Sequence, residues 1–380
     1  MIPKLKIGVA GLGRAFSLML PAFTQDPRVR LVAGADPRPQ ARSKFEADFG
    51  ARTFDSVEDL TAAADVDVVY VATPHERHAA HACLAASRGK HVLVEKPMAL
   101  SLEECEAMIA AARKTGVQLI VGHSHSFDAP VLHARKLIGS GEFGRVRMVS
   151  AFNYTDFLYR PRRPEELDPA RGGGAVFNQA AHQVDIVRLL AGSAVRTVRA
   201  FTGAWDPARP ADGAYSCQLR FEDGCFATLV YSGYAHFDSD AFAGWIGELG
   251  VRKDPAQYGA ARRRLTADEL AIKNARNYGG AAFEPPAAQQ AHQHFGQVIV
   301  SCERADLRPL PEGVMIYGDE AQRLEPLAPP RVPRVEVVDE LYEAIVHGCT
   351  PLHSGEWAMG TLQVCLAMRR SADEDREILL

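Results

Sequence analysis

The sequence predicts an α/β fold, with an N-terminal doubly wound parallel sheet of the Rossmann type and a C-terminal α+β domain with a large, open, mostly antiparallel sheet. Apolar strands and helical segments alternate over the first 120 residues, which is the pattern of a parallel sheet with crossover helices. A glycine-rich turn, Gly8–Gly13, follows the first strand. Beyond Gly122 strands dominate and alternate like antiparallel ones. We expect two domains, over residues 1–124 and 125–380.

In the N-terminal domain, the apolar runs predict strands over 6–10, 29–35, 66–72, 91–94 and 118–121. Helices are expected over 15–24, 39–49, 75–87 and 102–114. The last of these starts with Ser101 and has Glu104 three residues later, which is a capping-box pattern.

In the C-terminal domain, strands are expected over 145–154, 195–201, 214–221 and 225–231. The turn Glu222-Asp223-Gly224 predicts a hairpin between the last two. Helices are expected over 130–138, from about 178, and over 335–347 and 356–370. Residues 252–290 are charged and interrupted by prolines, which indicates an excursion from the sheet.

The composition is that of an ordinary globular protein of 380 residues, with 47% apolar and 24% charged residues. A net charge of −4 gives no indication of nucleic-acid or membrane-surface binding. The seven cysteines form no C-x-x-C pair, so we expect reduced thiols. No secretory signal or membrane span is visible at the sequence level, and we expect a cytoplasmic protein.

The glycine turn lies between a strand and a helix, which is the context of a dinucleotide-binding turn. The start of the following helix is suited to a pyrophosphate. We therefore expect cofactor contacts from four residues of this turn: Gly11, Gly13, Arg14 and Ala15. The usual third small residue would fall at Phe16, so helix and strand must pack differently there.

Asp36 ends the second strand, 25 residues beyond Gly11, where an acid is expected to bind the adenosine ribose hydroxyls. This favours NAD over NADP. Arg38 and Arg42 could instead accept a 2′-phosphate, and an Asp36 that only caps the turn before Pro37 is the structural alternative.

The third long strand ends in Thr73-Pro74-His75, where the proline opens a helix at the binding edge of the sheet. We expect Thr73, Pro74 and His78 at the cofactor. Histidines recur every three residues from His75 to His81, but this is poor ligand geometry without a carboxylate, and no metal is expected.

Glu95-Lys96-Pro97 follows the strand at 91–94. A lysine at the carboxyl end of a parallel strand lies on the ligand-binding edge of an open sheet, where the nicotinamide is expected. An isolated lysine here would usually be an exposed side chain without a role. Together with the other motifs, Glu95 and Lys96 are predicted to contact the cofactor.

These motifs, with Gly172-Gly173-Gly174 and His182-Gln183-Val184-Asp185, make the whole chain resemble the glucose-fructose oxidoreductase, inositol dehydrogenase and rhizopine-catabolism (Gfo/Idh/MocA) family. The resemblance implies NAD or NADP, hydride transfer from a secondary alcohol, and homodimers or homotetramers built through the large sheet. Lys96 matches the active-site lysine of the family and His182 its histidine.

The chain departs from the family pattern at Asn178, where an aspartate is usual, and at Ala180, where glycine is usual. An amide cannot act as a base, although Asn178 could hydrogen-bond a substrate hydroxyl. We therefore predict His182 as the general base. Lys96 would stabilise the developing alkoxide.

Three arginines, Arg160, Arg162 and Arg163, stand between prolines and aromatic residues in the loop after the strand at 145–154. Arginine forks bind carboxylates and stack on planar rings, so the loop favours a flat, anionic, cyclic substrate. An exposed basic loop or a subunit contact is the alternative. Further substrate contacts are predicted from His123, His125, Tyr154, Asn178 and His236.

The same segments resemble the branch of the family with phthalate cis-dihydrodiol dehydrogenases. This implies oxidation of cis-4,5-dihydro-4,5-dihydroxyphthalate to 4,5-dihydroxyphthalate in phthalate degradation. A sugar or cyclitol dehydrogenase and a non-catalytic dinucleotide-binding regulator are the two alternatives.

Overall fold

The computed structural model describes residues 3–257, 259–265, 268–330 and 332–380. The chain divides into two compact units, and each contains separate stretches of sequence. Unit 1 comprises Met1–His123, Leu270–Ala287 and Arg331–Leu362, and unit 2 comprises Ser124–Glu269, Ala288–Pro330 and Gln363–Leu380. The sequence places residues 270–287 and 331–362 in the second domain, whereas in the structure they belong to unit 1.

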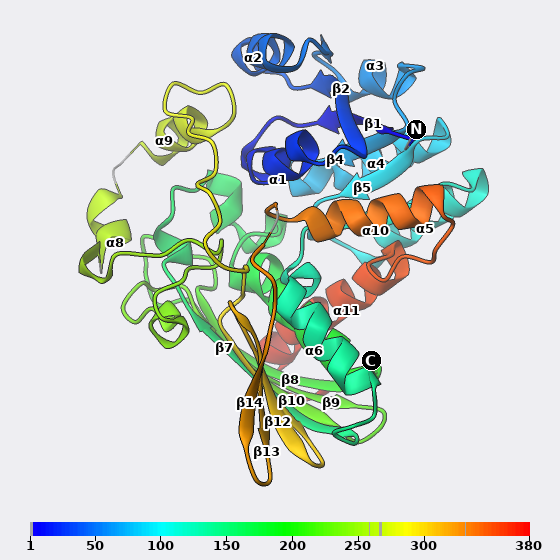
Figure 1. Cartoon of the computed structure of the whole chain (residues 1–380). Helices are drawn as coiled ribbons and strands as arrows, with labels where there is room; N and C mark the ends of the chain where they lie inside the picture. Colours follow the sequence, from blue (N-terminus) through cyan, green and yellow to red (C-terminus); the bar gives the residue numbers. More distant parts are fainter. Residues whose placement is uncertain (1–2, 258, 266–267, 331) are drawn as a thin grey trace. The chain divides into compact units, whose positions relative to one another are not determined.

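Unit 1 is built on a six-stranded parallel sheet, which confirms the predicted Rossmann arrangement (Figure 1). The strand order reverses between β1 and β4, and their carboxyl ends form the edge where such sheets bind ligands. In spatial order the strands are β3 (Arg52–Phe54), β2 (Val29–Ala35), β1 (Leu5–Ala10), β4 (Val68–Val71), β5 (His91–Val94) and β6 (Leu119–Val121).

One helix of unit 1, α5 (Leu102–Thr115), begins with the capping box that the sequence predicts. Ser101 Oγ accepts the Glu104 amide at 3.2 Å, and Glu104 Oε2 accepts the Leu100 amide at 2.9 Å, so the predicted start of α5 is confirmed. The sequence did not predict the short elements β3 and α3. The helices are α1 (Arg14–Gln25), α2 (Pro39–Phe49), α3 (Val57–Ala62), α4 (His78–Ser87), α5 (Leu102–Thr115) and α10 (Val335–Val346), with the first part of α11 (Gly355–Glu374).

The excursion predicted around 252–290 contains α8 (Ala260–Arg264) and α9 (Glu269–Arg276), and its last part packs on unit 1. Tyr278 is fully buried, 5.1 Å from Phe16 between ring centroids and 6.4 Å from Phe45. Its hydroxyl donates to Asp48 Oδ2 at 2.5 Å. Phe16 also lies 5.7 Å from Phe45, so the large residue in the glycine motif belongs to an aromatic cluster between α1 and α2.

We expect Tyr278→Ala to destabilise the protein by about 3–5 kcal/mol, because it removes a buried aromatic ring and leaves a cavity. Tyr278→Phe removes only the hydrogen bond to Asp48 and should cost about 1–3 kcal/mol. Urea unfolding of the cofactor-free protein, followed by circular dichroism, measures both. Equal losses in the two variants would contradict the packing argument.

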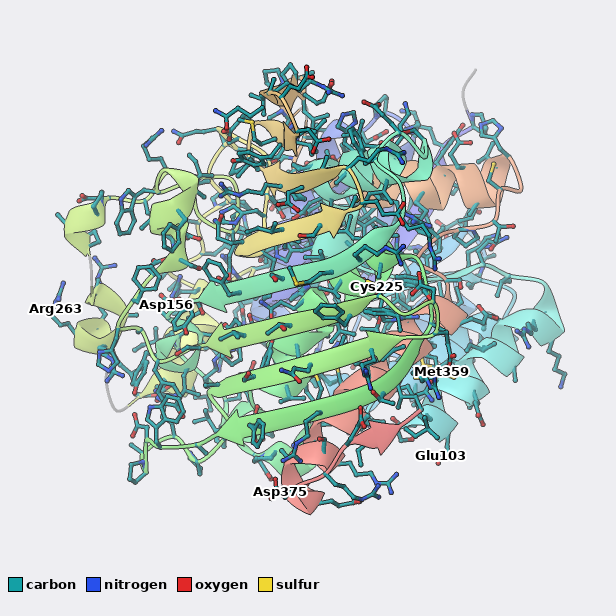
Figure 2. The ribbon with its side chains drawn as sticks, turned by 90° about the horizontal axis from the view of Figure 1, so that it is seen from below. Glu103, Asp156, Cys225, Arg263, Met359 and Asp375 are labelled. Carbon is teal, nitrogen blue, oxygen red and sulfur yellow. The ribbon has the colours of Figure 1, made fainter. Side chains whose placement is uncertain are left out.

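Unit 2 is built on a nine-stranded sheet, and its strands run across the view in Figure 2. Asp156 lies toward one end of the strands and Cys225 toward the other end. β7 and β10 pair in parallel and the remaining neighbours pair antiparallel, which confirms the predicted mostly antiparallel sheet. In spatial order the strands are β14 (Gln322–Pro326), β13 (Gly313–Gly318), β12 (Ala305–Leu310), β11 (Gln297–Cys302), β7 (Val146–Tyr154), β10 (Phe226–Ser232), β9 (Ala214–Phe221), β8 (Val195–Gly203) and β15 (Ile378–Leu379).

One buried helix of unit 2 packs on the centre of this sheet and positions the predicted histidine. It begins as a π-helical turn over Val176–Ala180 and continues as α7 (Ala181–Ala191), in contact with β7 and β10. The helix α6 (Ala129–Gly139) packs against α7. Among the helices in the described part of the chain, none is both long and apolar enough to cross a bilayer.

Candidate active site

The glycine turn of unit 1 has the geometry that a dinucleotide needs. Gly11 has φ +95°, and a Cβ there would lie 2.6 Å from the carbonyl oxygen of Ala72, so no larger residue fits. Gly13 is the N-cap of α1, and Arg14 and Ala15 are its first two residues. The turn thus places backbone amides and the positive end of a helix dipole at the predicted pyrophosphate site.

Asp36 is buried at the end of β2 and is held by its neighbours. Its Oδ2 accepts the Leu12 amide at 2.8 Å, and its Oδ1 accepts Arg38 Nε at 2.9 Å. Arg38 also donates to the Leu12 carbonyl at 2.7 Å and to the Tyr278 carbonyl at 3.3 Å. Arg42 Nη1 donates to the Asp36 carbonyl at 2.8 Å. Arg38 and Arg42, the two arginines that could accept a 2′-phosphate, are therefore hydrogen-bonded to residues of the glycine turn and of the end of β2. This arrangement fits NAD.

We expect Asp36→Ala to weaken NAD binding about 10- to 100-fold and to improve the relative use of NADP. The variant removes the acceptor for the ribose hydroxyls and releases Arg38, whose charge attracts a 2′-phosphate. Dissociation constants for NAD and NADP from protein fluorescence measure the change. Asp55→Ala, an exposed acid in unit 1, is the control. An unchanged NAD-to-NADP ratio would contradict the assignment.

Two histidines that follow β4, His78 and His81, lie within hydrogen-bond distance of neighbouring residues. His78 is fully buried, with Nε2 2.9 Å from the Thr73 carbonyl and Nδ1 2.9 Å from the Pro97 carbonyl. Burial lowers the pKa of His78, although the two carbonyls favour its charged form. His81 Nδ1 lies 3.0 Å from Thr73 Oγ1. His78 thus connects the Thr73-Pro74 turn to the Lys96-Pro97 turn, and its direct contact with the cofactor stays a prediction.

Glu95 and Lys96 follow β5, and the Lys96–Pro97 peptide is cis. Glu95 is buried and accepts a hydrogen bond from the Tyr70 hydroxyl. Burial raises the pKa of Glu95, and the nearby Arg334 guanidinium and the Tyr70 hydrogen bond only partly offset this. Lys96 is partly exposed at the carboxyl end of the strand, the edge expected to bind the nicotinamide.

In unit 2, two histidines and an aromatic ring form a buried cluster at the start of α7. The ring centroids of His125 and His182 are 4.8 Å apart, and Phe295 lies 5.0 Å from His125 and 4.8 Å from His182. The His125 amide donates to His182 Nδ1 at 3.4 Å. His182, which is predicted to be catalytic, and His125, which is predicted to bind substrate, therefore lie next to each other in unit 2.

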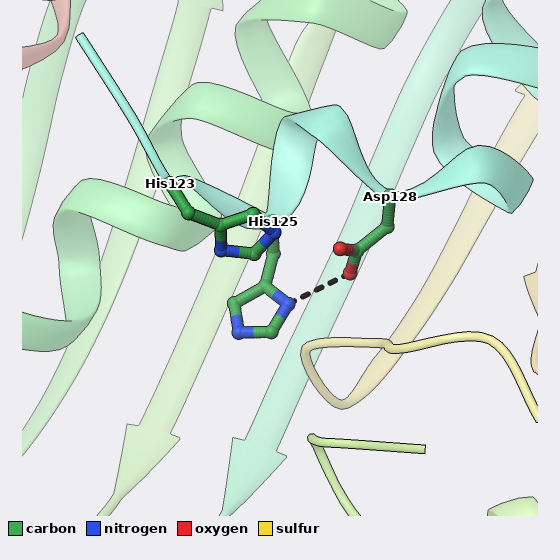
Figure 3. Close-up of side chains that lie close together, drawn as sticks. All are labelled: His123, His125 and Asp128. Atoms are coloured by element: carbon green, nitrogen blue, oxygen red, sulfur yellow. Dashed lines mark hydrogen bonds and ion pairs between the residues drawn. The ribbon is translucent and has the colours of Figure 1, made fainter. Parts of the chain in front are cut away.

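The His125 ring also binds Asp128, which the sequence reasoning did not select. Nδ1 of His125 lies 2.7 Å from Asp128 Oδ2 (Figure 3). One ligand-type atom from each of His123, His125 and Asp128 lies within 4.8 Å of the other two, a spacing that would also suit a small metal ion. The sequence predicts substrate contacts from His123 and His125 but not from Asp128, and a histidine–carboxylate pair three residues apart was the signal that could have identified Asp128.

Asn178 does not replace the family aspartate as a base. It lies in the π-helical turn, and its Nδ2 donates to the carbonyls of Gly172 at 3.2 Å and Gly174 at 2.9 Å. These bonds tie the predicted glycine segment to the helix. A substrate contact from Asn178 stays a prediction.

The three arginines of the predicted loop have different surroundings. Arg160 donates to Asp156 Oδ1 at 2.7 Å and to Glu248 Oε2 at 3.2 Å. Arg163 Nε lies 3.6 Å from Glu166 Oε2. Both are paired with carboxylates, so the loop is in part a set of internal ion pairs.

Arg162 is the most buried of the three and has the longest contact to a carboxylate. The Nε of Arg163 likewise has no hydrogen-bond partner among the described residues. The Arg162 guanidinium lies 3.8 Å above the Phe157 ring, its Nη2 donates to the Phe157 carbonyl, and its Nε has no hydrogen-bond partner among the described residues. Glu166 Oε1 approaches Nη1 only to 4.0 Å. Burial lowers the pKa of Arg162 to about 10, and the charge of Glu166 offsets only part of this effect.

The sequence reasoning missed Arg209, which lies 47 residues beyond Arg162. Its Nη2 donates to Glu269 Oε1 at 2.6 Å, and Glu269 Oε2 accepts the Arg162 amide at 2.9 Å. Nη1 of Arg209 is buried without a hydrogen-bond partner among the described residues. No local motif marks Arg209, because only the fold brings its segment to the loop.

Two further residues that the sequence predicts for substrate binding are Tyr154 and His236. Tyr154 ends β7 and its ring is 5.7 Å from Phe237. His236 is exposed, with Nε2 3.2 Å from Arg262 Nη2. Their substrate contacts, and the predicted pairing of Lys96 in unit 1 with His182 in unit 2, stay predictions.

Comparison with known proteins gives the family of the chain. Residues 5–123 match the oxidoreductase family with an NAD-binding Rossmann fold, and residues 131–250 match the GFO/IDH/MocA C-terminal domain. The chain belongs to the Gfo/Idh/MocA family. It is therefore an NAD-dependent dehydrogenase, which excludes the predicted alternative of a non-catalytic regulator.

Two relatives are similar over nearly the whole length of this Gfo/Idh/MocA enzyme. The 1-carboxy-3-chloro-3,4-dihydroxycyclohexa-1,5-diene dehydrogenase of Comamonas testosteroni is 48% identical over 372 residues, covering 96% of this chain and 94% of that protein. A solved structure from Bordetella bronchiseptica RB50, described as a dehydrogenase, is 41% identical with a TM-score of 0.94, covering 99% and 100% of the two chains.

The inositol 2-dehydrogenase of Rhizobium meliloti (strain 1021) is a more distant relative. It is 32% identical over 189 residues, which cover 49% of this chain and 55% of that protein.

Proposed function

We propose that this enzyme oxidises a carboxylated cis-dihydrodiol of a cyclohexadiene ring to the corresponding catechol, with cis-4,5-dihydro-4,5-dihydroxyphthalate as the preferred substrate. The observation that carries the proposal is the buried Arg162 guanidinium, stacked on Phe157 with an unused Nε. A carboxylate on a flat ring would supply a counter-charge, and removing one partner of such a buried charge pair typically costs about 2–5 kcal/mol.

A row of aromatic rings within unit 2 connects Arg162 to His182. Phe157 lies 6.3 Å from Tyr231, Tyr231 is stacked 6.2 Å from Phe295, and Phe295 is 4.8 Å from His182. Flat rings of this kind favour a planar cyclic substrate over a strongly hydroxylated sugar.

The relative from Comamonas testosteroni supports the same substrate class. Its name describes a substrate with one carboxyl group and two hydroxyl groups on a cyclohexadiene ring. The second carboxyl group of the phthalate dihydrodiol would suit a site with more than one arginine, and the described residues offer Arg209 Nη1 no hydrogen-bond partner.

The residues of this chain would divide the reaction as follows. NAD, held by the turn at Gly11 and by Asp36, would supply the acceptor for the hydride. Arg162 orients the ring through its carboxylate, and the Lys96 ammonium stabilises the negative charge that develops on the oxygen. The oxidised ring tautomerises to the aromatic catechol, which makes the overall reaction strongly favourable.

A spectrophotometric screen of NAD and NADP reduction tests the proposal. It compares cis-4,5-dihydro-4,5-dihydroxyphthalate, a dihydrodiol with a single carboxyl group, an uncharged cis-dihydrodiol, inositol and an aldose. The expected order of kcat/KM places the carboxylated diols first. Faster turnover of inositol or the aldose would overturn the proposal in favour of a sugar or cyclitol dehydrogenase.

A further inference from the structure

The hydroxyl of Tyr231 belongs to a buried chain of hydrogen bonds in unit 2. Tyr231 lies near the end of β10, and only 1% of the residue is exposed. Its hydroxyl donates to Gln179 Oε1 at 3.1 Å and lies 2.7 Å from Thr155 Oγ1. Thr155 Oγ1 in turn accepts the amide of Phe157 at 3.0 Å. The chain therefore connects Phe157 to Gln179 through two hydroxyl groups.

The hydrogen bonds of this chain all run in one direction, because each hydroxyl has a single proton to donate. The proton of Tyr231 is used on Gln179, so the hydroxyl of Thr155 donates to the Tyr231 oxygen. Burial raises the pKa of Tyr231, so its hydroxyl stays protonated at neutral pH. Loss of this one hydroxyl would remove the partners of both Gln179 and Thr155 in the chain, at a buried position where an unmet hydrogen bond is costly.

One end of the chain reaches the helix that carries the predicted catalytic histidine. Gln179 lies in the π-helical turn Val176–Ala180, which continues directly into the helix of His182. Such turns are rare and frequently occur at functional sites. The ring of Tyr231 is also stacked 6.2 Å from Phe295, which lies 4.8 Å from His182. Tyr231 is therefore connected to the surroundings of His182 through both its hydroxyl and its ring.

The other end of the chain reaches Arg162. The Arg162 guanidinium lies 3.8 Å above the Phe157 ring, and its Nη2 donates to the Phe157 carbonyl. The segment is anchored to β10 by the Thr155 amide, which donates to the Ser232 carbonyl at 2.8 Å. Two residues after this anchor, the Phe157 amide binds the Thr155 hydroxyl. The chain thus orients Phe157, and Phe157 orients the guanidinium.

We propose that Tyr231 is a positioning residue for the substrate, because its buried hydroxyl fixes the Arg162 guanidinium relative to the helix of His182. A carboxylate bound by Arg162 sets the place of the substrate ring, so a shift of the guanidinium moves the reacting carbon. Tyr231 acts through Thr155 and Phe157. This inference rests on the proposed function, since it takes Arg162 as the residue that binds the carboxylate.

The test measures kcat/KM with cis-4,5-dihydro-4,5-dihydroxyphthalate and with an uncharged cis-dihydrodiol. Tyr231→Phe keeps the ring and removes the hydroxyl. We expect it to lose about 10-fold on the dicarboxylated diol and less than about threefold on the uncharged one. Thr155→Val breaks the same chain and should give the same pattern. Thr155→Ser keeps a hydroxyl and should recover most of the wild-type activity.

Tyr215→Phe is the matched control. Tyr215 is buried in the same unit and its ring is stacked 5.4 Å from Tyr231, but its hydroxyl donates to Gln183 Oε1 at 2.7 Å. This variant also loses a buried hydrogen bond, so thermal unfolding should show a similar loss of stability. The ratio of activities on the two diols should stay at its wild-type value. A change in this ratio as large as that of Tyr231→Phe would contradict the proposal.

A double-mutant cycle with Arg162→Met tests whether Tyr231 acts through the guanidinium. Once Arg162 has been replaced, Tyr231→Phe should cause no further loss on the dicarboxylated diol. Additive losses would overturn the proposal. An equal loss on both diols in Tyr231→Phe alone would also overturn it, because the hydroxyl would then support the fold only.

Crystal structures of the wild type and of Tyr231→Phe need no substrate, so they separate failure of this inference from failure of the proposed function. We expect the ring at position 231 to stay stacked on Phe295 and the Arg162 guanidinium to leave its place above the Phe157 ring. An unmoved guanidinium would rule out the positioning role whatever the substrate is. A displaced guanidinium in an enzyme that does not prefer carboxylated diols would overturn the proposed function alone.

Discussion

Replacing Lys96 with alanine is expected to lower kcat about 1,000-fold while the enzyme still binds NAD. The lysine lies at the carboxyl end of β5, next to a buried Glu95 and at the sheet edge that binds nucleotides. A cation aimed at the developing alkoxide acts mainly in the transition state, and loss of such a group typically costs about 100- to 1,000-fold in kcat. Initial rates at saturating NAD and a titration of NAD binding measure the two effects.

Lys114→Ala is the matched control, because this exposed lysine in the last turn of α5 lies in the same unit and should leave both quantities unchanged. Lys96→Arg should recover little activity, since a planar guanidinium does not place its charge where the ammonium does. If Lys96→Ala instead raises KM and leaves kcat intact, the lysine binds substrate without stabilising the transition state.

The second large effect is expected at Arg162. Arg162→Met should lower kcat/KM for the dicarboxylated diol about 100-fold and should leave the KM for NAD unchanged. The methionine keeps a long apolar side chain over Phe157 but removes the charge that a substrate carboxylate would meet. For an uncharged cis-dihydrodiol the loss should be small, so the variant should discriminate less between the two substrates.

Arg145→Met, just before β7, is the control, since this arginine is 59% exposed. Thermal unfolding checks that the lost hydrogen bond from Arg162 to the Phe157 carbonyl has not disrupted the loop. An equal loss on charged and uncharged diols would show that Arg162 supports the loop and does not recognise a carboxylate.

The sequence patterns predicted most helices and strands of unit 1, because these patterns depend on residues that are close together in the chain. β2, β5 and α2 have the predicted limits, and each is a buried strand or a helix opened by proline. The elements that were missed, such as β3 and α3, are three and six residues long and carry little periodicity. The strands β11–β14 were also missed individually, since their pairing depends on long-range contacts.

The site was predictable where a motif sets a backbone geometry. Gly11 was identified because only glycine fits its positive φ and its close approach to Ala72. Arg209 and Glu248 could not be identified, because each acts through partners that are distant in sequence. The general base stays a prediction at His182, because the partners that orient the rings of His125 and His182 are distant in sequence.

The division of unit 1 into three stretches of sequence has a consequence for how this protein is made. Phe16 and Phe45 are synthesised early, but Tyr278, whose ring packs on both of them, is synthesised more than 200 residues later. The last part of unit 1, up to Leu362, arrives after most of unit 2. The nucleotide-binding half therefore cannot be completed during translation until most of the substrate half has been synthesised, and a fragment ending at residue 124 would expose the cluster to water.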